Sequence, residues 1–165
     1  MLSPDSLKRI DREIAKYPAG RAQSAVIAAL AIAQDEKGWL STETIDFVAS
    51  YLSLPSILVY EVATFYEMYN MRPVGNKITI CTNLPCALHG AAQAAVHLKQ
   101  SLGIDFDETT SDGSFTLKQG ECFGACGDAP VLLVNNKRMC SWMSPEKLEA
   151  LIAELKAEAA KGGNR

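Results

Sequence analysis

Four of the five cysteines in this 165-residue chain have a spacing that could hold a metal centre. Cys81 and Cys86 form the pattern CxxxxC, and Cys122 and Cys126 form CxxxC. Each pair is local, whereas the two pairs lie far apart in the sequence. A [2Fe-2S] cluster needs two thiolates on each of its two irons. The spacing therefore suggests one cysteine pair for each iron, with these four residues as the cofactor-binding metal ligands.

Other metal and redox centres also fit parts of this pattern. A structural zinc site accepts four cysteines in pairs with two to four residues between ligands, so spacing alone leaves zinc open. A thioredoxin-type dithiol generally uses CxxC, which this chain lacks. A Rieske centre would need two histidines on one iron. His89 and His97 fall two turns apart on one predicted helix, which is a poor placement for that role.

The fifth cysteine and the glycines around the second pair have ordinary explanations. Cys140 falls in a predicted hairpin, where a small buried thiol is expected. The second loop reads GECFGACGDAP, and its small residues let backbone N–H groups approach the sulfurs as donors. Gly120, Gly124 and Gly127 could equally serve as turn formers. The spacing does not match GxGxxG, so no nucleotide site is predicted.

The second half of the chain alternates between extended and helical patterns. Residues 77–82, KITICT, are rich in β-branched residues and predict a strand that leads into the first cysteine pair. A helix is expected over 87–102, strands over 115–119 and 131–134, and a hairpin at Asn135-Asn136 into 137–142. Ser144, Pro145 and Glu146 begin a final helix to about residue 159, before a tail expected to fray. This β-α-β-β-β-α order predicts an α/β layer.

The first half reads as helical. Helices are expected over residues 3–16, 21–37, 41–52 and 56–69, with Ser3 and Ser41 as caps. Residues 72–76 contain Pro73 and Gly75, which mark a boundary. The chain is therefore expected to contain an N-terminal helical region, residues 1–74, and a second domain, residues 75–165.

The aromatic run over residues 62–69 allows two interpretations. It is too apolar for a solvated helix, so it could form a partner surface or the joint between the two halves. Aromatic stripes also commonly belong to a core. Tyr66 and Tyr69 are the residues whose substitution would separate these interpretations.

Composition excludes several classes of function. The formal charge of −3 and pI of about 5.4 provide no basic footprint for nucleic acid. The longest apolar run, residues 25–33, is too short to span a bilayer. The N-terminus lacks the apolar stretch of a secretory signal, so a reducing, cytosol-like compartment is expected. Free thiols, rather than disulfides, are expected there.

Several motifs together resemble a known family. They are EKGWLS, VATFYEMY, ITICTNLPCALHGA and CFGACGDAP, in this order over nearly the whole chain. This set resembles the 24 kDa-type [2Fe-2S] subunit of respiratory complex I, which in bacteria is the E subunit of NADH:quinone oxidoreductase. The resemblance implies an N-terminal helical bundle followed by a thioredoxin-like [2Fe-2S] ferredoxin domain. It also favours iron over zinc at Cys81, Cys86, Cys122 and Cys126.

The resemblance carries further expectations about function. The chain would be an electron-transfer subunit of an oxidoreductase, with no complete active site and no catalytic residue of its own. Its partners would be a flavoprotein subunit that binds FMN and NADH, and other peripheral-arm subunits. The complex would carry electrons from NADH to quinone, at the cytoplasmic face of the cell membrane. The alternative is the equivalent diaphorase subunit of an NAD-dependent hydrogenase or formate dehydrogenase.

Overall fold

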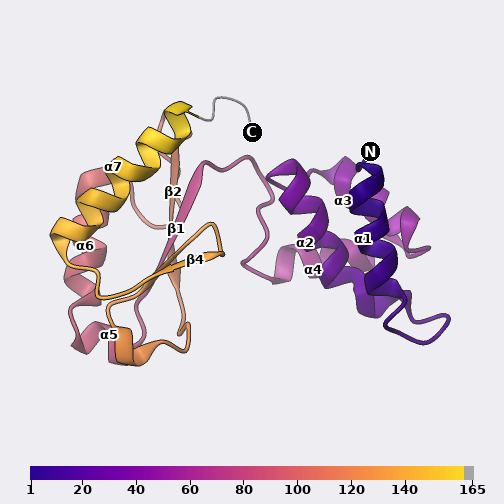
Figure 1. The fold of residues 1–165 in the computed structure, drawn as a ribbon, viewed down its shortest axis with the longest axis horizontal. Helices are drawn as coiled ribbons and strands as arrows, with labels where there is room; N and C mark the ends of the chain where they lie inside the picture. Colours follow the sequence, from indigo (N-terminus) through magenta and orange to yellow (C-terminus); the bar gives the residue numbers. More distant parts are fainter. Residues whose placement is uncertain (162–165) are drawn as a thin grey trace. The chain divides into compact units, whose positions relative to one another are not determined.

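The chain forms two compact units, the first from Met1 to Pro73 and the second beginning at Val74 (Figure 1). The structure, a computed structural model, describes residues 1–161. The expectation of a frayed tail concerns residues that mostly lie outside this range. Each unit has a hydrophobic core of its own. The first unit is helical and the second mixes helices with a sheet, which confirms the predicted α/β class with helices at the N-terminus.

Four helices and one short 3-10 segment build the first unit. They are α1 (Pro4–Ile14), η1 (Ala22–Ala25), α2 (Val26–Lys37), α3 (Thr42–Tyr51) and α4 (Ser56–Phe65). The predicted serine caps are confirmed, because the Ser3 hydroxyl accepts from the Ser6 amide and the Ser41 hydroxyl from the Thr44 amide. Helix α2 lies at the centre of the core, with Leu30 fully buried.

Helix α4 is shorter than the predicted helix over residues 56–69. It ends at Phe65, and Tyr66 adopts an extended backbone with ψ of 119°. The turn after Tyr66 brings the Tyr69 ring into the core, where its hydroxyl donates to the Ile27 carbonyl at 2.7 Å. Burial of this ring offsets the loss of a further helical turn, which local periodicity does not reveal.

A four-stranded sheet forms the base of the second unit. Its strands are β1 (Asn76–Cys81), β2 (Phe115–Gly120), β3 (Leu132–Val134) and β4 (Arg138–Cys140), in the order β2-β1-β3-β4. The β1–β2 pair is parallel and the other two pairs are antiparallel. Helices α6 (Ala91–Leu102) and α7 (Pro145–Lys161) cover one face of the sheet (Figure 1). Ile78, Ile80 and Leu117 face them in the core.

The helix predicted over residues 87–102 is in fact two helices. A short helix, α5 (Leu84–Leu88), precedes α6, and Gly90 between them has a φ of 94°. This left-handed conformation suits glycine and interrupts the helix. Helix α5 begins three residues before the predicted start because the Asn83 side chain accepts from the Leu84 amide.

The connection between β3 and β4 agrees with the predicted tight turn. Asn135 and Asn136 have φ values of 53° and 57°, which asparagine tolerates better than most residues. The Lys137 amide donates to the Val134 carbonyl at 3.0 Å and closes the turn.

Glu36 provides a test of the first unit's electrostatics. Its carboxylate accepts hydrogen bonds from the Ser3 amide and hydroxyl, both at 2.9 Å, and so joins the end of α2 to the start of α1. Hydrogen bonds, first from the Ser6 hydroxyl and then from the Ser3 amide, lower the pKa of Glu36 from 4.5 to about 2. We expect Glu36→Gln to lower the free energy of unfolding at pH 7 by about 1–2 kcal/mol, less than the full pKa shift corresponds to, because solvent screens this exposed carboxylate.

The stabilisation of the fold by Glu36 depends on pH. A lowered pKa in the folded state stabilises the fold above pH 4.5, and this contribution is lost as the pH falls toward 2. Urea denaturation followed by circular dichroism should therefore show a wild-type advantage at pH 7 that shrinks at pH 3. Glu61→Gln, at an exposed position on α4, is the control. A difference that is the same at both pH values would contradict the prediction.

Candidate metal centre

Parallel pairing of β1 and β2 places both cysteine loops at one edge of the sheet. Cys81 is the last residue of β1 and lies opposite Gly120, the last residue of β2. Because the two strands run in the same direction, the loops that follow them leave the sheet side by side. Cys86 lies in the first of these loops, on α5, and Cys122 and Cys126 lie in the second.

The first cysteine pair is buried. Cys81 and Cys86 are each 1% exposed and pack with Ala91 and Val131. The Cys81 amide donates to the Val131 carbonyl at 3.1 Å, and the Val131 amide donates to the Cys86 sulfur. The two thiols are also hydrogen-bonded to each other. Residue 131, directly before β3, therefore helps to fix both members of the pair.

The second cysteine pair is exposed and closely spaced. The Cys122 and Cys126 sulfurs lie 3.7 Å apart, which is much longer than a disulfide bond of about 2.05 Å. Two thiolates on one tetrahedral metal ion, with metal–sulfur bonds of about 2.3 Å, would lie about 3.7 Å apart. This pair therefore has the separation of two ligands on a single metal ion.

The two pairs lie near each other without merging into one four-sulfur group. Phe123 and Ala125 of the second loop pack against the buried cluster around the first pair. A thiolate at Cys126 raises the pKa of Cys86, and a thiolate at Cys81 raises the pKa of Cys126, so the two pairs lie within electrostatic range of each other. Among residues 1–161, no three histidine, cysteine or acidic side chains are grouped as ligands of one ion. The donor set is thus two neighbouring thiol pairs, which fits a centre with two irons.

One thiol of each pair, Cys86 in the first and Cys126 in the second, has a raised pKa. Burial, with the hydrogen bond to Cys81, raises the pKa of Cys86. The hydrogen bond to Cys122, with some burial, raises the pKa of Cys126. Metal binding requires the thiolates, so loading this site releases protons.

The three glycines of the second loop differ in what they do. A side chain at Gly120 would approach the Phe123 ring to 2.6 Å and the Thr79 methyl to 2.7 Å, so close packing requires glycine there. Gly124 has a φ of 76° and donates its amide to the Cys122 sulfur at 3.3 Å. The expected N–H donor is therefore confirmed at Gly124. Gly127 has open space around it, with an ordinary φ.

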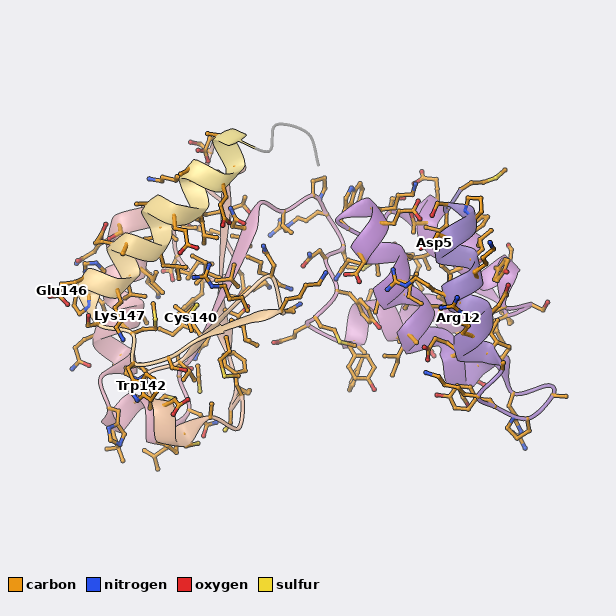
Figure 2. The ribbon with its side chains drawn as sticks, in the orientation of Figure 1. Asp5, Arg12, Cys140, Trp142, Glu146 and Lys147 are labelled. Carbon is orange, nitrogen blue, oxygen red and sulfur yellow. The ribbon has the colours of Figure 1, made fainter. Side chains whose placement is uncertain are left out.

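The remaining cysteine and the histidines lie elsewhere. Cys140, labelled in Figure 2, lies on β4 and lines a groove against α7. Burial raises the pKa of this half-buried thiol. The His97 ring meets the Glu149 carboxylate at 2.7 Å, and His89 is an exposed residue at the end of α5.

Comparison with known proteins assigns the chain to a family. The sequence model described as "Thioredoxin-like [2Fe-2S] ferredoxin" matches residues 10–156. The chain belongs to this family. Membership confirms the predicted fold and the predicted [2Fe-2S] cofactor, whereas the assignment of individual cysteines as its ligands stays a prediction.

Several relatives share most of the chain. The E subunit of NADH-quinone oxidoreductase from Rickettsia bellii (strain RML369-C) is 43% identical over 145 residues, which are 87% of this chain and 86% of that protein. The mitochondrial NADH dehydrogenase [ubiquinone] flavoprotein 2 of Dictyostelium discoideum is 40% identical, over 80% of this chain and 54% of that protein. The family resemblance inferred from the motifs is confirmed.

A solved structure shows the same fold. The air-oxidised form of an NAD+-reducing [NiFe]-hydrogenase matches with a TM-score of 0.69 and 22% identity. The match covers 78% of this chain and 23% of the hydrogenase chain. At this identity the likeness concerns the fold.

Sequence reasoning missed two residues that shape the site. Asn83 caps α5 and so sets the position of Cys86. The letters Asn-Leu-Pro, a cap followed by a proline in the first turn, are a recognisable helix start that could have identified it. Val131 contributes through its backbone, and no sequence signal marks that role.

Substitution of one buried ligand tests the assignment. We expect Cys86→Ser to lower the [2Fe-2S] content of the purified chain by about tenfold or more, because a buried thiolate is replaced by a poorer ligand. Cys140→Ser is the matched control and should keep the wild-type content. Iron and sulfide analysis with electron paramagnetic resonance provides the measurement. An unchanged spectrum in Cys86→Ser would eliminate Cys86 as a ligand.

Proposed function

We propose that this chain is the electron-transfer subunit of the NADH dehydrogenase module of NADH-quinone oxidoreductase. One observation carries the proposal: two neighbouring cysteine pairs lie at one sheet edge, in a chain 43% identical to a subunit of that enzyme over most of both lengths. A bound [2Fe-2S] cluster supplies one-electron transfer chemistry. The chain is thus part of an oxidoreductase that is completed by other subunits.

The four cysteines have distinct parts in this proposal. Cys81 and Cys86 would hold one iron in a buried environment, supported by the backbone of Val131. Cys122 and Cys126 would hold the other iron at the surface, with the Gly124 amide directed at a sulfur. Such N–H donors stabilise negative charge on sulfur and raise the reduction potential.

The two units correspond to two proposed domains. Residues 1–74 would form an N-terminal helical domain and residues 75–165 the ferredoxin domain that holds the cluster. The diaphorase subunit of an NAD-dependent hydrogenase or formate dehydrogenase is the second candidate, supported by the shared fold with an NAD+-reducing hydrogenase. The sequence identities favour NADH-quinone oxidoreductase.

The other subunits of the complex would determine where this chain is located in the cell. None of the helices within residues 1–161 has the length and apolar character needed to cross a membrane. Because its relatives are subunits of NADH-quinone oxidoreductase, we propose that this chain is attached to the cytoplasmic face of the membrane through other subunits of the complex. No basic footprint for nucleic acid is expected at a net charge of −3.

Electron transfer can be tested by reduction with and without a flavoprotein partner. We expect the anaerobically purified chain to contain about two irons and two sulfides, and to gain a paramagnetic signal with dithionite. NADH should produce this signal only when the FMN-containing subunit is added, because no nicotinamide site is predicted in this chain. A colourless protein that contains zinc would contradict the proposal, and so would reduction by NADH without the flavoprotein.

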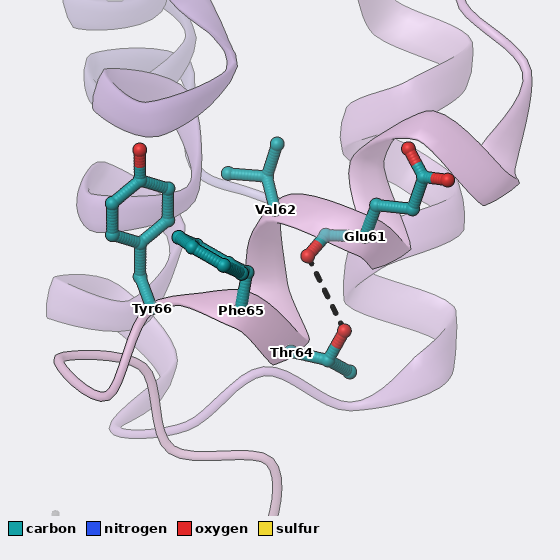
Figure 3. A pocket seen from close by; sticks show the side chains of 5 residues that line it. All are labelled: Glu61, Val62, Thr64, Phe65 and Tyr66. Atoms are coloured by element: carbon teal, nitrogen blue, oxygen red, sulfur yellow. Dashed lines mark hydrogen bonds between the residues drawn. The ribbon is translucent and has the colours of Figure 1, made fainter.

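The end of α4 supplies a candidate surface for that flavoprotein. Phe65 and Tyr66 are 78% and 39% exposed, and their rings meet edge to face with centroids 5.1 Å apart. Figure 3 shows these two rings beside Val62, around an open hollow that Glu61 and Thr64 also line. Tyr69 is buried, so the aromatic run divides into a surface part and a core part. Exposed aromatic residues are common anchors of protein interfaces.

Alanine substitution at this surface tests its role. We expect Phe65→Ala or Tyr66→Ala to weaken binding to the flavoprotein by about tenfold, because each removes a large apolar contact. Tyr17→Ala is the matched control, since Tyr17 is 40% exposed on the loop after α1. Affinities come from titration of the purified subunits. Wild-type affinity in both α4 variants would show that this surface lies outside the interface.

A further inference from the structure

The two cysteine loops are joined to each other beyond the end of the sheet. Regular pairing of β1 and β2 stops at Cys81 and Gly120. One residue further on, the Thr82 amide donates to the Gly120 carbonyl at 3.1 Å. The Gln119 side-chain amide donates to the Thr82 hydroxyl at 2.8 Å. One backbone and one side-chain hydrogen bond thus extend the strand pairing by one residue.

The last of these contacts joins Asn83 to Glu121. The Asn83 side-chain oxygen accepts from the Leu84 amide at 3.2 Å and so caps the helix that carries Cys86. The nitrogen of the same side chain donates to the Glu121 carboxylate at 2.9 Å. Glu121 directly precedes Cys122. One amide group therefore connects the helix that carries Cys86 to the residue before Cys122.

The hydrogen bond between Asn83 and Glu121 is placed where it can hold the metal ligands in position. A hydrogen bond to a carboxylate is shorter and stronger than one between neutral groups. Metal ligands must be held within about 0.5 Å of their working positions by the residues behind them. Cys122 and Cys126 are exposed and lack the surrounding core that fixes the first pair. A contact at residue 121 therefore restrains the pair that has the least support of its own.

The Glu121 carboxylate is held at the Asn83 side chain, between the loop of Cys86 and the loop of Cys122, and so brings a negative charge to the part of the chain that carries the cysteines. Reduction adds a further electron to a centre that is already negative. Net charge around iron–sulfur clusters is one of the factors that set their reduction potential. An anion held near the cluster opposes reduction.

We propose that Asn83 and Glu121 form a clasp that holds the two cysteine pairs in their cluster-binding arrangement, and that the Glu121 carboxylate lowers the reduction potential. Both are positioning residues, because they act through the cysteines. The clasp rests on the proposed ligand set of the preceding section and adds to it the residues that align the ligands.

Three variants of the full-length, cluster-loaded chain separate the contact from the charge. Asn83→Ser keeps a helix cap and the carboxylate but lacks the amide donor. Glu121→Ala removes both the acceptor and the charge. Glu121→Gln keeps an acceptor oxygen and removes only the charge. Glu158→Gln, at an exposed position on α7, is the control for loss of a carboxylate elsewhere in the same unit.

The first measurement is the rate at which a chelator removes iron from the oxidised protein. We expect Asn83→Ser and Glu121→Ala to lose the cluster about tenfold faster than wild type, and Glu121→Gln within about twofold of it. The double variant Asn83→Ser/Glu121→Ala should lose its cluster no faster than the faster of the two single variants, because the two residues share one contact. Wild-type rates in both single variants would overturn the clasp, as would independent, multiplying effects in the double variant.

The second measurement is a redox titration monitored by electron paramagnetic resonance. At a fixed potential, the ratio of reduced to oxidised cluster should rise about tenfold in Glu121→Gln, equivalent to a shift of about 59 mV for one electron. Asn83→Ser and Glu158→Gln should stay close to the wild-type potential. A wild-type potential in Glu121→Gln would overturn the role of the charge. A wild-type chain without any [2Fe-2S] signal overturns the proposed function and the clasp together, whereas the outcomes above overturn the clasp alone.

Discussion

Parallel pairing of β1 with β2 is the constraint on which the metal centre depends. Two strands that run in the same direction and end opposite each other deliver their following loops to the same place. Had these strands been antiparallel neighbours, Cys81 and the second loop would leave the sheet at opposite edges. Helices α6 and α7 bury one face of the sheet and hold this pairing in place. The chemistry at the edge therefore rests on apolar contacts beneath it.

Much of this arrangement is predictable from the sequence because local signals carry it. The β-branched run KITICT predicts a strand that ends at the first cysteine, and Asn135-Asn136 predicts the hairpin turn. The serine caps of α1 and α3 are equally local. The grouping of the cysteines into two pairs follows from their spacing, and the family resemblance supplies the identity of the metal centre.

The features that sequence reasoning missed depend on contacts between distant residues. Helix α4 ends early because Tyr69 donates to a carbonyl 42 residues away. The Asn83–Glu121 contact joins residues 38 apart, and its existence requires that both loops already be placed by the sheet. Val131 acts through its backbone groups, and Gly120 is needed because it has no side chain. No periodicity or propensity encodes such effects, since they arise only when separated segments meet.

Unequal burial of the two cysteine pairs has a consequence for the order in which the protein is built. Cys81 and Cys86 lie beneath the surface, while Cys122 and Cys126 face solvent. With the proposed ligand set, iron and sulfide would reach the site from the side of the second loop, and oxidants or chelators would reach the centre from the same side. Any partner protein that covers residues 122–127 closes this entrance. Insertion of the inorganic ions must then come first and docking second, so that a chain assembled while empty would be sealed in that state.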